Sequence, residues 1–305
     1  MTVTTQRKID FTSRLVKGIL SIEPLADFAK SRARQMMIKR AEVMGVSWRE
    51  NVQQLSDRNW SENFAHIQDL DLKYPDYYTT SFHAYPEGNL SWQAAWEVES
   101  AARSVHAKIW PEIGVNGDTM LRQSYHQALQ QHLTITPTQI LDLGCGVGMS
   151  SIALQKVYPS AEITGIDLSP YFLAVANYRG KQQQLPIKWV HGAAESTALA
   201  SQSFDLVSAS LVFHELPATA ARAIITEAHR LLRPGGYLSL MDMNPQSSVF
   251  QKMPPYVLTL LKSTEPYLDE YFALDLEQTF RSAGFTTPSI AVTTPRHRII
   301  IAQAQ

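Results

Sequence analysis

The clearest pattern of apolar and polar positions lies near the middle of the chain, where a short apolar run carrying one acid ends in a glycine-rich turn. The run covers residues 140–143, and Gly144, Gly146 and Gly148 follow at alternate positions. Glycine lets the backbone adopt positive φ and brings main-chain N–H groups close to a bound molecule. Residues 149–158 then carry the apolar face of a helix that ends before a proline. A strand, a glycine turn and a helix in this order predict the nucleotide-binding corner of a doubly wound sheet.

The spacing of the glycines separates two classes of cofactor site. A dinucleotide fingerprint that starts at Gly144 has its third glycine at position 149, where this chain has Met149. The third glycine is Gly148 instead, and Asp142 stands two positions before the first. The pattern acid-x-Gly-x-Gly-x-Gly resembles the first motif of class I S-adenosylmethionine (SAM) dependent methyltransferases.

The resemblance continues in order along residues 119–305. The matching segments, which resemble the second to fifth strands and the closing hairpin of that family, are 163–167, 189–195, 204–210, 231–241, and the pair 290–293 with 298–302. Asp167, at the end of the second of these strands, resembles the acid that binds both ribose hydroxyls of SAM. A carboxylate suits that role because it accepts two hydrogen bonds from a diol. Dehydrogenases are not expected to end in such a hairpin.

The resemblance implies an α/β fold with a doubly wound, seven-stranded, mostly parallel sheet of the Rossmann-like methyltransferase type and an antiparallel C-terminal hairpin. It also implies SAM as the cofactor. The residues that it assigns to SAM binding are Asp142, Gly144, Cys145, Gly146, Gly148, Asp167, Leu168, Ala194, Glu195, Ser210 and Leu211.

The residues outside the matching segments predict two further parts of the protein, an N-terminal cap and an insertion in the SAM-binding domain. Residues 1–118 are expected to form a helical N-terminal cap or lid, and 119–305 the SAM-binding domain, in which the apolar insertion 244–270 lines the substrate site. The cap is rich in aromatic residues, and the i,i+4 spacing of Trp92 and Trp96 favours packing in a core. For Tyr78, His83 and Tyr85, a place in the pocket and a place in the packing both stay open.

Composition and charge limit the binding partners and the cellular compartment that we expect for this chain. The 305 residues carry a net charge of -1 with a pI of about 6.8, so no electrostatic footprint for nucleic acid is present. Cys145 is the only cysteine; this excludes an intrachain disulfide, and its place in the glycine turn favours packing beside the cofactor. The sequence has no apolar run of transmembrane length and no secretory signal, which predicts a cytoplasmic enzyme.

The N-terminal segment has an unusual charge balance. Residues 1–49 contain ten Lys or Arg against four Asp or Glu, and their apolar positions fit short amphipathic helices. A helical cap that packs on the catalytic domain and keeps a solvated basic face is the favoured interpretation, because basic amphipathic helices also occur in soluble proteins. Such helices can also lie on an anionic membrane surface, so a peripheral membrane contact stays open.

The candidate catalytic residues lie just after the fourth strand-like segment, 204–210. His214 and Glu215 resemble the start of a zinc His-Glu-x-x-His motif, but Pro217 and Ala218 end that match, so we expect no metal. Residues 210–213 lack the Asn-Pro-Pro-Tyr type motif of adenine amino-methylases. His214 is the candidate base for a phenol, enol or indole-type nucleophile, and a structural histidine is the competing interpretation. His83, Tyr78 and Asp242 are further candidates.

The chain is thus expected to methylate a small lipophilic or aromatic molecule, as enzymes of quinone biosynthesis and secondary metabolism do. C-methylation of a quinone ring and N- or O-methylation of an aromatic natural product such as an alkaloid both stay open. A non-catalytic SAM-binding regulator or assembly factor is the alternative from another class.

Overall fold

The computed structural model describes residues 23–80, 85 and 87–305 and contains one seven-stranded sheet. The strands lie in the order β3-β2-β1-β4-β5-β7-β6. Their bounds are β1 Gln139–Leu143, β2 Glu162–Asp167, β3 Lys188–His191, β4 Phe204–Ser210, β5 Leu232–Met243, β6 Ser289–Val292 and β7 His297–Gln303. The first five strands pair in parallel, and β7 runs antiparallel to both β5 and β6. The predicted mostly parallel sheet with an antiparallel hairpin is confirmed.

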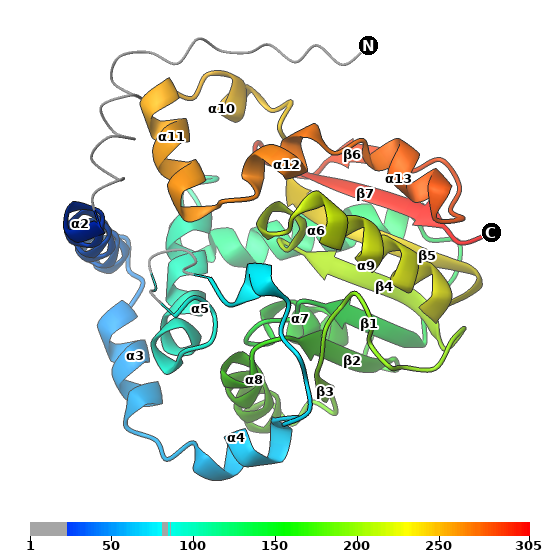
Figure 1. Cartoon of the computed structure of the whole chain (residues 1–305), viewed down its shortest axis with the longest axis horizontal. Coiled ribbons are helices and arrows are strands. Elements are labelled where there is room, and N and C mark those ends of the chain that lie inside the picture. Colours follow the sequence, from blue (N-terminus) through cyan, green and yellow to red (C-terminus); the bar gives the residue numbers. More distant parts are fainter. Residues whose placement is uncertain (1–22, 81–84, 86) are drawn as a thin grey trace.

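Apolar residues alternate between the two faces of the sheet. On β1, Ile140 packs against one helical layer, whereas Leu141 and Leu143 pack against the other. The first layer contains α6 (Gly117–His132) and α7 (Met149–Val157). The second contains α9 (Ala218–Leu231), α12 (Leu268–Ala273) and α13 (Leu276–Ser282). Both faces are therefore covered, as a parallel sheet requires (Figure 1).

The Pro-Gly-Gly turn at 234–236 is part of β5 rather than a separate connection before it. Pairing with β4 runs from Phe204–Leu232 to Leu206–Tyr237, so three more residues lie on β5 than on β4 between these pairs. Gly235 has φ of +82°, which allows the irregularity without a steric cost.

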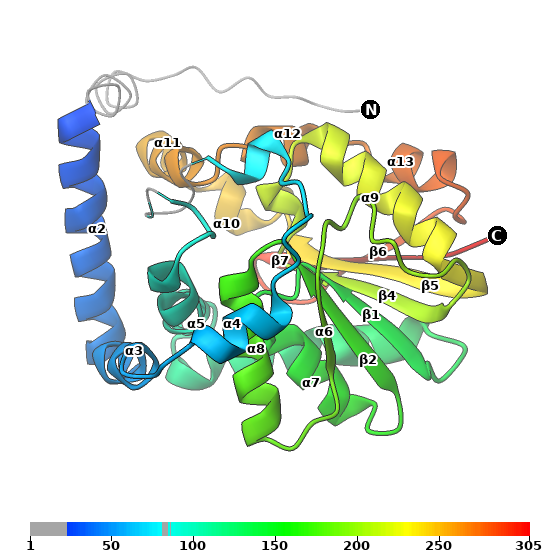
Figure 2. The ribbon, with the colours of Figure 1, turned by 60° about the horizontal axis from the view of Figure 1, so that its bottom comes forward.

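The N-terminal region forms a helical cap beside α8 (Pro170–Gln182). Its helices are α2 Glu23–Val43, α3 Trp48–Ser56, α4 Ser61–Ile67 and α5 Trp92–His106, with the 3-10 turns η1 Asp76–Tyr78 and η2 Gly114–Asn116. Figure 2 shows α2 at the edge of the molecule and α4 and α5 next to α8. Trp92 and Trp96 stack with ring centroids 6.0 Å apart in the core between cap and α8, as their spacing predicts. The predicted boundary at 118/119 falls inside the first turn of α6.

Three helices lie between β5 and α13: α10 Ser248–Gln251, α11 Pro255–Thr264 and α12. They lie over one end of the sheet, near the η3 turn (Phe213–Glu215) that follows β4. None of the helices in the described part of the chain is long and apolar enough to cross a bilayer. Of the basic segment 1–49, residues 1–22 lie outside the described residues, as does His83. A peripheral membrane contact stays a prediction.

Candidate active site

The sheet reverses its winding direction between β1 and β4, and the sequence-predicted site residues gather at that point. Strands β2 and β3 lie on one side of β1, whereas β4 and β5 lie on the other. Ligands of doubly wound proteins bind at the carboxyl ends of the strands beside such a reversal. The glycine turn follows β1, Asp167 ends β2, Ser210 ends β4, and Leu211 follows it.

The glycine turn adopts a backbone that only glycine accommodates at low cost. Gly144 has φ of +63°, and a Cβ there would lie 2.7 Å from Val212, the residue before η3. Gly148 has φ of +83° and begins α7 without a side-chain cap, which leaves the first N–H groups of the helix for another partner. Cys145 is buried, and burial raises the pKa of its thiol well above the ordinary value. Its burial agrees with a packing role, and its contact with the cofactor stays a prediction.

Asp142 supports the turn from beneath. It is fully buried, and its Oδ2 accepts hydrogen bonds from the hydroxyls of Ser150 and Ser151, each at 2.6 Å. Burial raises the pKa of Asp142 to about 6, although the two serine hydroxyls favour the charged form. These contacts tie the end of β1 to the start of α7. The assignment of Asp142 to direct SAM contact stays a prediction.

Asp167 joins the glycine turn to the end of β2. Its Oδ2 accepts the N–H of Gly146 and its Oδ1 accepts the N–H of Ser169, both at 2.8 Å. The hydroxyl of Tyr78 lies 3.4 Å from Oδ1. Burial raises the pKa of Asp167 to about 6 in spite of these donors. The carboxylate thus lies between the end of β2 and the glycine turn, and a cap residue covers it. The assignment of Asp167 to the ribose diol stays a prediction.

Glu195 lies in the turn after β3 with only one of its oxygens satisfied. Its Oε1 accepts the hydroxyl of Tyr77 at 2.5 Å, whereas its Oε2 is buried without a hydrogen-bond partner among the described residues. A buried acceptor without a partner costs about 1–3 kcal/mol, so a donor is expected there when the site is filled. Ala194 is half-buried beside it. This open acceptor and the uncapped start of α7 fit a nucleoside cofactor.

His191, the last residue of β3, binds the cap where the cap passes over the carboxyl end of that strand. Sequence analysis did not single out this histidine. Nδ1 of His191 accepts the N–H of Asp69 at 2.9 Å, so Nε2 carries the proton. Nε2 lies 3.1 Å from both the carbonyl oxygen of Leu168 and the hydroxyl of Tyr74. His191 therefore fastens segment 69–74 over the edge of the sheet, which places Tyr77 and Tyr78 above the cofactor residues.

The backbone after β4 is strained at the reversal point. Leu211 has φ of +60°, which is unusual for a residue with a Cβ, and its N–H donates to the carbonyl of Met241 at 2.8 Å. Ser210 and Leu211 are half-buried. The strained residue turns the chain sharply into η3, which carries His214.

His214 and Asp242 form a buried pair at the carboxyl ends of β4 and β5. The Nδ1–H of His214 donates to Oδ1 of Asp242 at 2.8 Å, and the main-chain N–H of His214 donates to Oδ2 at 3.2 Å. Burial opposes the charge on His214, but Asp242, Glu265 and Glu215 together raise the pKa of the ring to about 10. Burial likewise opposes the charge on Asp242, yet His214 lowers the pKa of that carboxyl below its ordinary value.

The insertion after β5 meets the cap above this pair. The rings of Tyr77 in the cap and Tyr267, just before α12, lie edge to face with centroids 6.2 Å apart. The hydroxyl of Tyr271 donates to the carbonyl of Met243 at 2.9 Å, which holds α12 against β5. Tyr77 also contacts Tyr78, whose hydroxyl lies 3.4 Å from Asp167, and α12 packs against η3, so the cofactor residues and His214 share one edge of the sheet.

The structure thus brings together nearly all of the predicted residues that it describes. His214, Tyr78 and the SAM-assigned set lie at the same edge, while Tyr85 turns to Glu97 in the cap, at 3.0 Å. Sequence analysis missed Tyr77, His191 and Glu265. All three lie within segments that it noted, Glu265 in the insertion 244–270, but Glu265 is 50 residues beyond Glu215, and no spacing rule connects these two residues.

Comparison with known proteins shows that the chain is similar to methyltransferases. Residues 140–236 match the model of the methyltransferase domain family. An uncharacterized methyltransferase of Synechocystis sp. is 32% identical over 165 residues, which cover 54% of this chain and 74% of that protein. A ubiquinone biosynthesis O-methyltransferase of Psychrobacter arcticus is 33% identical over 159 residues, covering 50% of this chain and 60% of its own.

Two further proteins extend the comparison. A phthiotriol/phenolphthiotriol dimycocerosates methyltransferase of Mycobacterium leprae is 32% identical over 129 residues, 41% of this chain and 44% of that protein. A crystal structure of a proposed O-methyltransferase from Nostoc punctiforme superposes with a TM-score of 0.53 at 18% identity, covering 80% of this chain and 67% of that one. The latter likeness concerns the fold alone.

Proposed function

Since the chain belongs to the class I SAM-dependent methyltransferases, we propose that it methylates a small lipophilic or aromatic acceptor whose nucleophilic atom lies beside His214. The observation that carries the proposal is the buried His214–Asp242 pair at the edge of the sheet that also holds Asp167 and Glu195.

The described residues fit the cofactor. Asp167 would hold the ribose diol, Glu195 has an open buried acceptor, and the uncapped start of α7 offers main-chain donors. When bound, SAM supplies a methyl group on a positively charged sulfur that is already a good leaving group. The protein therefore needs chiefly to align the acceptor and to exclude water, which contributes up to ~7–11 kcal/mol in favourable cases.

Aromatic residues of the cap and the insertion support an apolar acceptor. The ring of Tyr77 in the cap contacts the rings of Tyr78 and of Tyr267, which stands just before α12. Helix α12 packs against η3, which carries His214. Tyr78 is among the aromatic side chains held at this edge by contacts to charged partners. Aromatic walls with a few fixed polar groups are typical of small-molecule sites. The relatives from Psychrobacter arcticus and Mycobacterium leprae are described as acting in ubiquinone biosynthesis and on phthiotriol-type lipids, which agrees with this class of acceptor.

Asp242 holds the His214 ring through Nδ1, and Nε2 lies 3.9 Å from Oε1 of Glu215. Because the pKa of the ring is raised to about 10, Nε2 carries a proton near neutral pH and is placed to donate a hydrogen bond to an oxygen of the acceptor. The ring would take the proton of an O–H, N–H or C–H nucleophile only in its neutral form. The acceptor atom, whether carbon, nitrogen or oxygen, determines which of these occurs.

The test uses SAM labelled on the methyl group, with lipid and aqueous extracts of the source cells offered separately. We expect one labelled product from the lipid extract, identified by mass spectrometry. His214→Asn should reduce its formation at least about tenfold while the SAM dissociation constant stays within about threefold of wild type. The exposed His66 supplies the matched control, since His66→Asn should change neither quantity.

Two outcomes would contradict the proposal. Methylation by His214→Asn at the wild-type rate would remove His214 from the acceptor site. Tight SAM binding without a labelled product in any extract would favour a non-catalytic SAM-binding regulator or assembly factor.

A further inference from the structure

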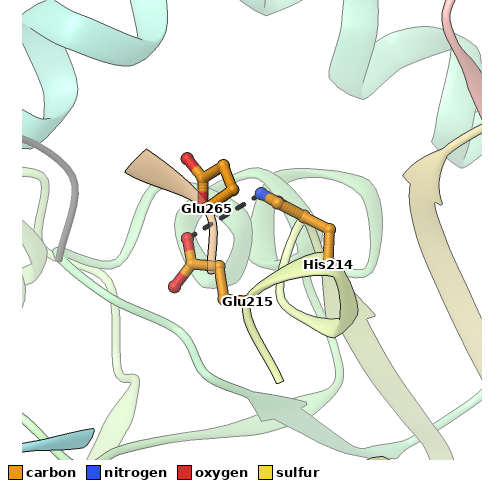
Figure 3. Close-up of side chains that lie close together, drawn as sticks. All are labelled: His214, Glu215 and Glu265. Carbon is orange, nitrogen blue, oxygen red and sulfur yellow. Dashed lines mark ion pairs between the residues drawn. The ribbon is translucent and has the colours of Figure 1, made fainter. Parts of the chain in front are cut away.

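Beyond the His214–Asp242 pair, His214 also faces two glutamates. One ligand atom from each of His214, Glu215 and Glu265 lies within 4.8 Å of the other two. Figure 3 shows the ring nitrogen of His214 directed toward the carboxylates of Glu215 and Glu265. His214 and Glu215 belong to η3, whereas Glu265 lies just beyond α11 in the insertion. His214 and Glu265 are each only 6% exposed.

The two ring nitrogens of His214 face different carboxylates, Nδ1 toward Asp242 and Nε2 toward Glu215. Its Nδ1–H is committed to Asp242 at 2.8 Å, which fixes the ring and leaves Nε2 for the cluster. Nε2 lies 3.9 Å from Oε1 of Glu215, beyond hydrogen-bond distance, and within the described ranges no residue makes a hydrogen bond to it. A carboxylate that holds the far nitrogen of an imidazole is the usual support of a metal-bound histidine.

We propose that His214, Glu215 and Glu265 bind a divalent cation, with Asp242 as the carboxylate that orients the histidine. Two glutamates balance the charge of a dication, and a mixed nitrogen and oxygen set suits Mn²⁺, Fe²⁺ or Zn²⁺ better than the all-oxygen sites of Mg²⁺ and Ca²⁺. A cation here would take the place of a proton on Nε2. Because the third ligand comes from the insertion, the site would also fasten that wall to η3.

The inference rests on the proposed function and narrows its acceptor. Three protein ligands leave open coordination positions, as in catalytic metal sites. These positions would take an oxygen of the acceptor, so the favoured class is a phenol, an enol or a pair of neighbouring oxygens on an aromatic ring. A bound hydroxyl would lose its proton to solvent more readily and keep the lone pair for the new bond to carbon. The expectation of no metal relied on the missing His-Glu-x-x-His motif, and a ligand 50 residues away lies outside any such motif.

The experiment titrates the full-length protein, first freed of metal by a chelator, with Mn²⁺ and separately with Zn²⁺. Mn²⁺ is followed by the loss of the free-ion electron paramagnetic resonance signal, and Zn²⁺ by calorimetry. We expect a single tight site per chain for at least one ion. Glu265→Gln should weaken it at least about tenfold, and Asp242→Asn by about 10–100-fold. The exposed Glu277 on α13 is the matched control, because Glu277→Gln should leave the affinity unchanged.

The melting temperature of each variant is measured with and without the ion. This measurement separates the loss of the metal site from a general loss of stability. A folded Glu265→Gln protein whose melting temperature no longer responds to the ion supports the site. Wild-type protein that binds neither ion, or a site that Glu265→Gln leaves intact, overturns it. SAM binding, measured in the presence of chelator, tests the proposed function separately, so the two failures are distinguishable.

Discussion

The hydroxyl of Tyr78 in the cap lies 3.4 Å from Oδ1 of Asp167, the carboxylate that the family resemblance assigns to the ribose of SAM. Burial and the charge of Asp167 raise the pKa of Tyr78 well above its ordinary value, so the phenol stays protonated and acts as a donor. The other donors to Asp167 are the main-chain N–H groups of Gly146 and Ser169, which belong to the fold itself. Tyr78 is therefore the donor that a ribose hydroxyl can replace.

Tyr78→Phe should bind SAM as tightly as wild type or up to about tenfold more tightly, because the cofactor no longer competes with a phenol for Asp167. Isothermal calorimetry measures the difference. Tyr256, which is 45% exposed on α11, provides the control: Tyr256→Phe should leave the affinity unchanged. Binding about tenfold weaker in Tyr78→Phe would show instead that the hydroxyl contacts the cofactor.

SAM affinity should depend on pH through Asp167. Burial raises the pKa of this carboxyl to about 6, and only the ionised form accepts two hydrogen bonds from a diol. Affinity is therefore complete above that pKa and falls as pH decreases through it. Asp167→Ala should lose at least ~1.5 kcal/mol of binding energy at pH 8, and Asp167→Asn should flatten the pH profile between 5 and 7. A wild-type affinity that is constant over this interval would contradict the assignment of Asp167.

Gly148→Ala should destabilise the protein by ~2–4 kcal/mol, because it combines a left-handed backbone with overpacking. Gly148 has φ of +83°, and a Cβ there would lie 2.7 Å from the ring of Trp189. Gly114 also has positive φ, at +56°, but nothing lies within 4 Å of its Cβ position. Gly114→Ala should thus cost only the conformational part, ~1–2 kcal/mol. Urea unfolding compares the two variants, and equal losses would disprove the packing role of Trp189.

Glu227 should make folding stability depend on pH in the acidic range. Its Oε1 accepts both the N–H and the hydroxyl of Thr197, and Arg230 pairs with the same carboxylate. Burial opposes the charge, but Arg230 and Thr197 lower the pKa of Glu227 to about 2 from an ordinary value near 4.5. The unfolded chain therefore takes up a proton first, so this stabilisation is complete above about pH 5 and is lost as pH falls toward 2.

Glu227→Gln should accordingly be ~1–2 kcal/mol less stable than wild type at pH 7, an estimate reduced because Arg230 is partly exposed. The gap should narrow at pH 3. Urea unfolding at both pH values gives the two differences. A gap that stays the same at pH 3 would mean that the carboxylate contributes through packing rather than through its charge.

The sequence by itself determined the sheet and the cofactor half of the site. Positions 140–148 combine an apolar strand, glycines that tolerate positive φ and a helix start, and each of these is a local property that nearby residues impose. The alternation along the strands places apolar residues on both faces, which requires helices on both sides. The order of segments then fixes which strands end beside the glycine turn.

Only the tertiary structure decided which distant side chains meet at His214. Asp242 lies 28 residues from His214, and Glu265 comes from the insertion, so their approach depends on the pairing of β4 with β5 and on the packing of α12 near η3. The same holds for Tyr78, whose place over Asp167 depends on the contacts of His191 with the cap. These contacts span long stretches of chain and leave no periodic trace in the sequence, because they arise where the carboxyl ends of separate strands converge.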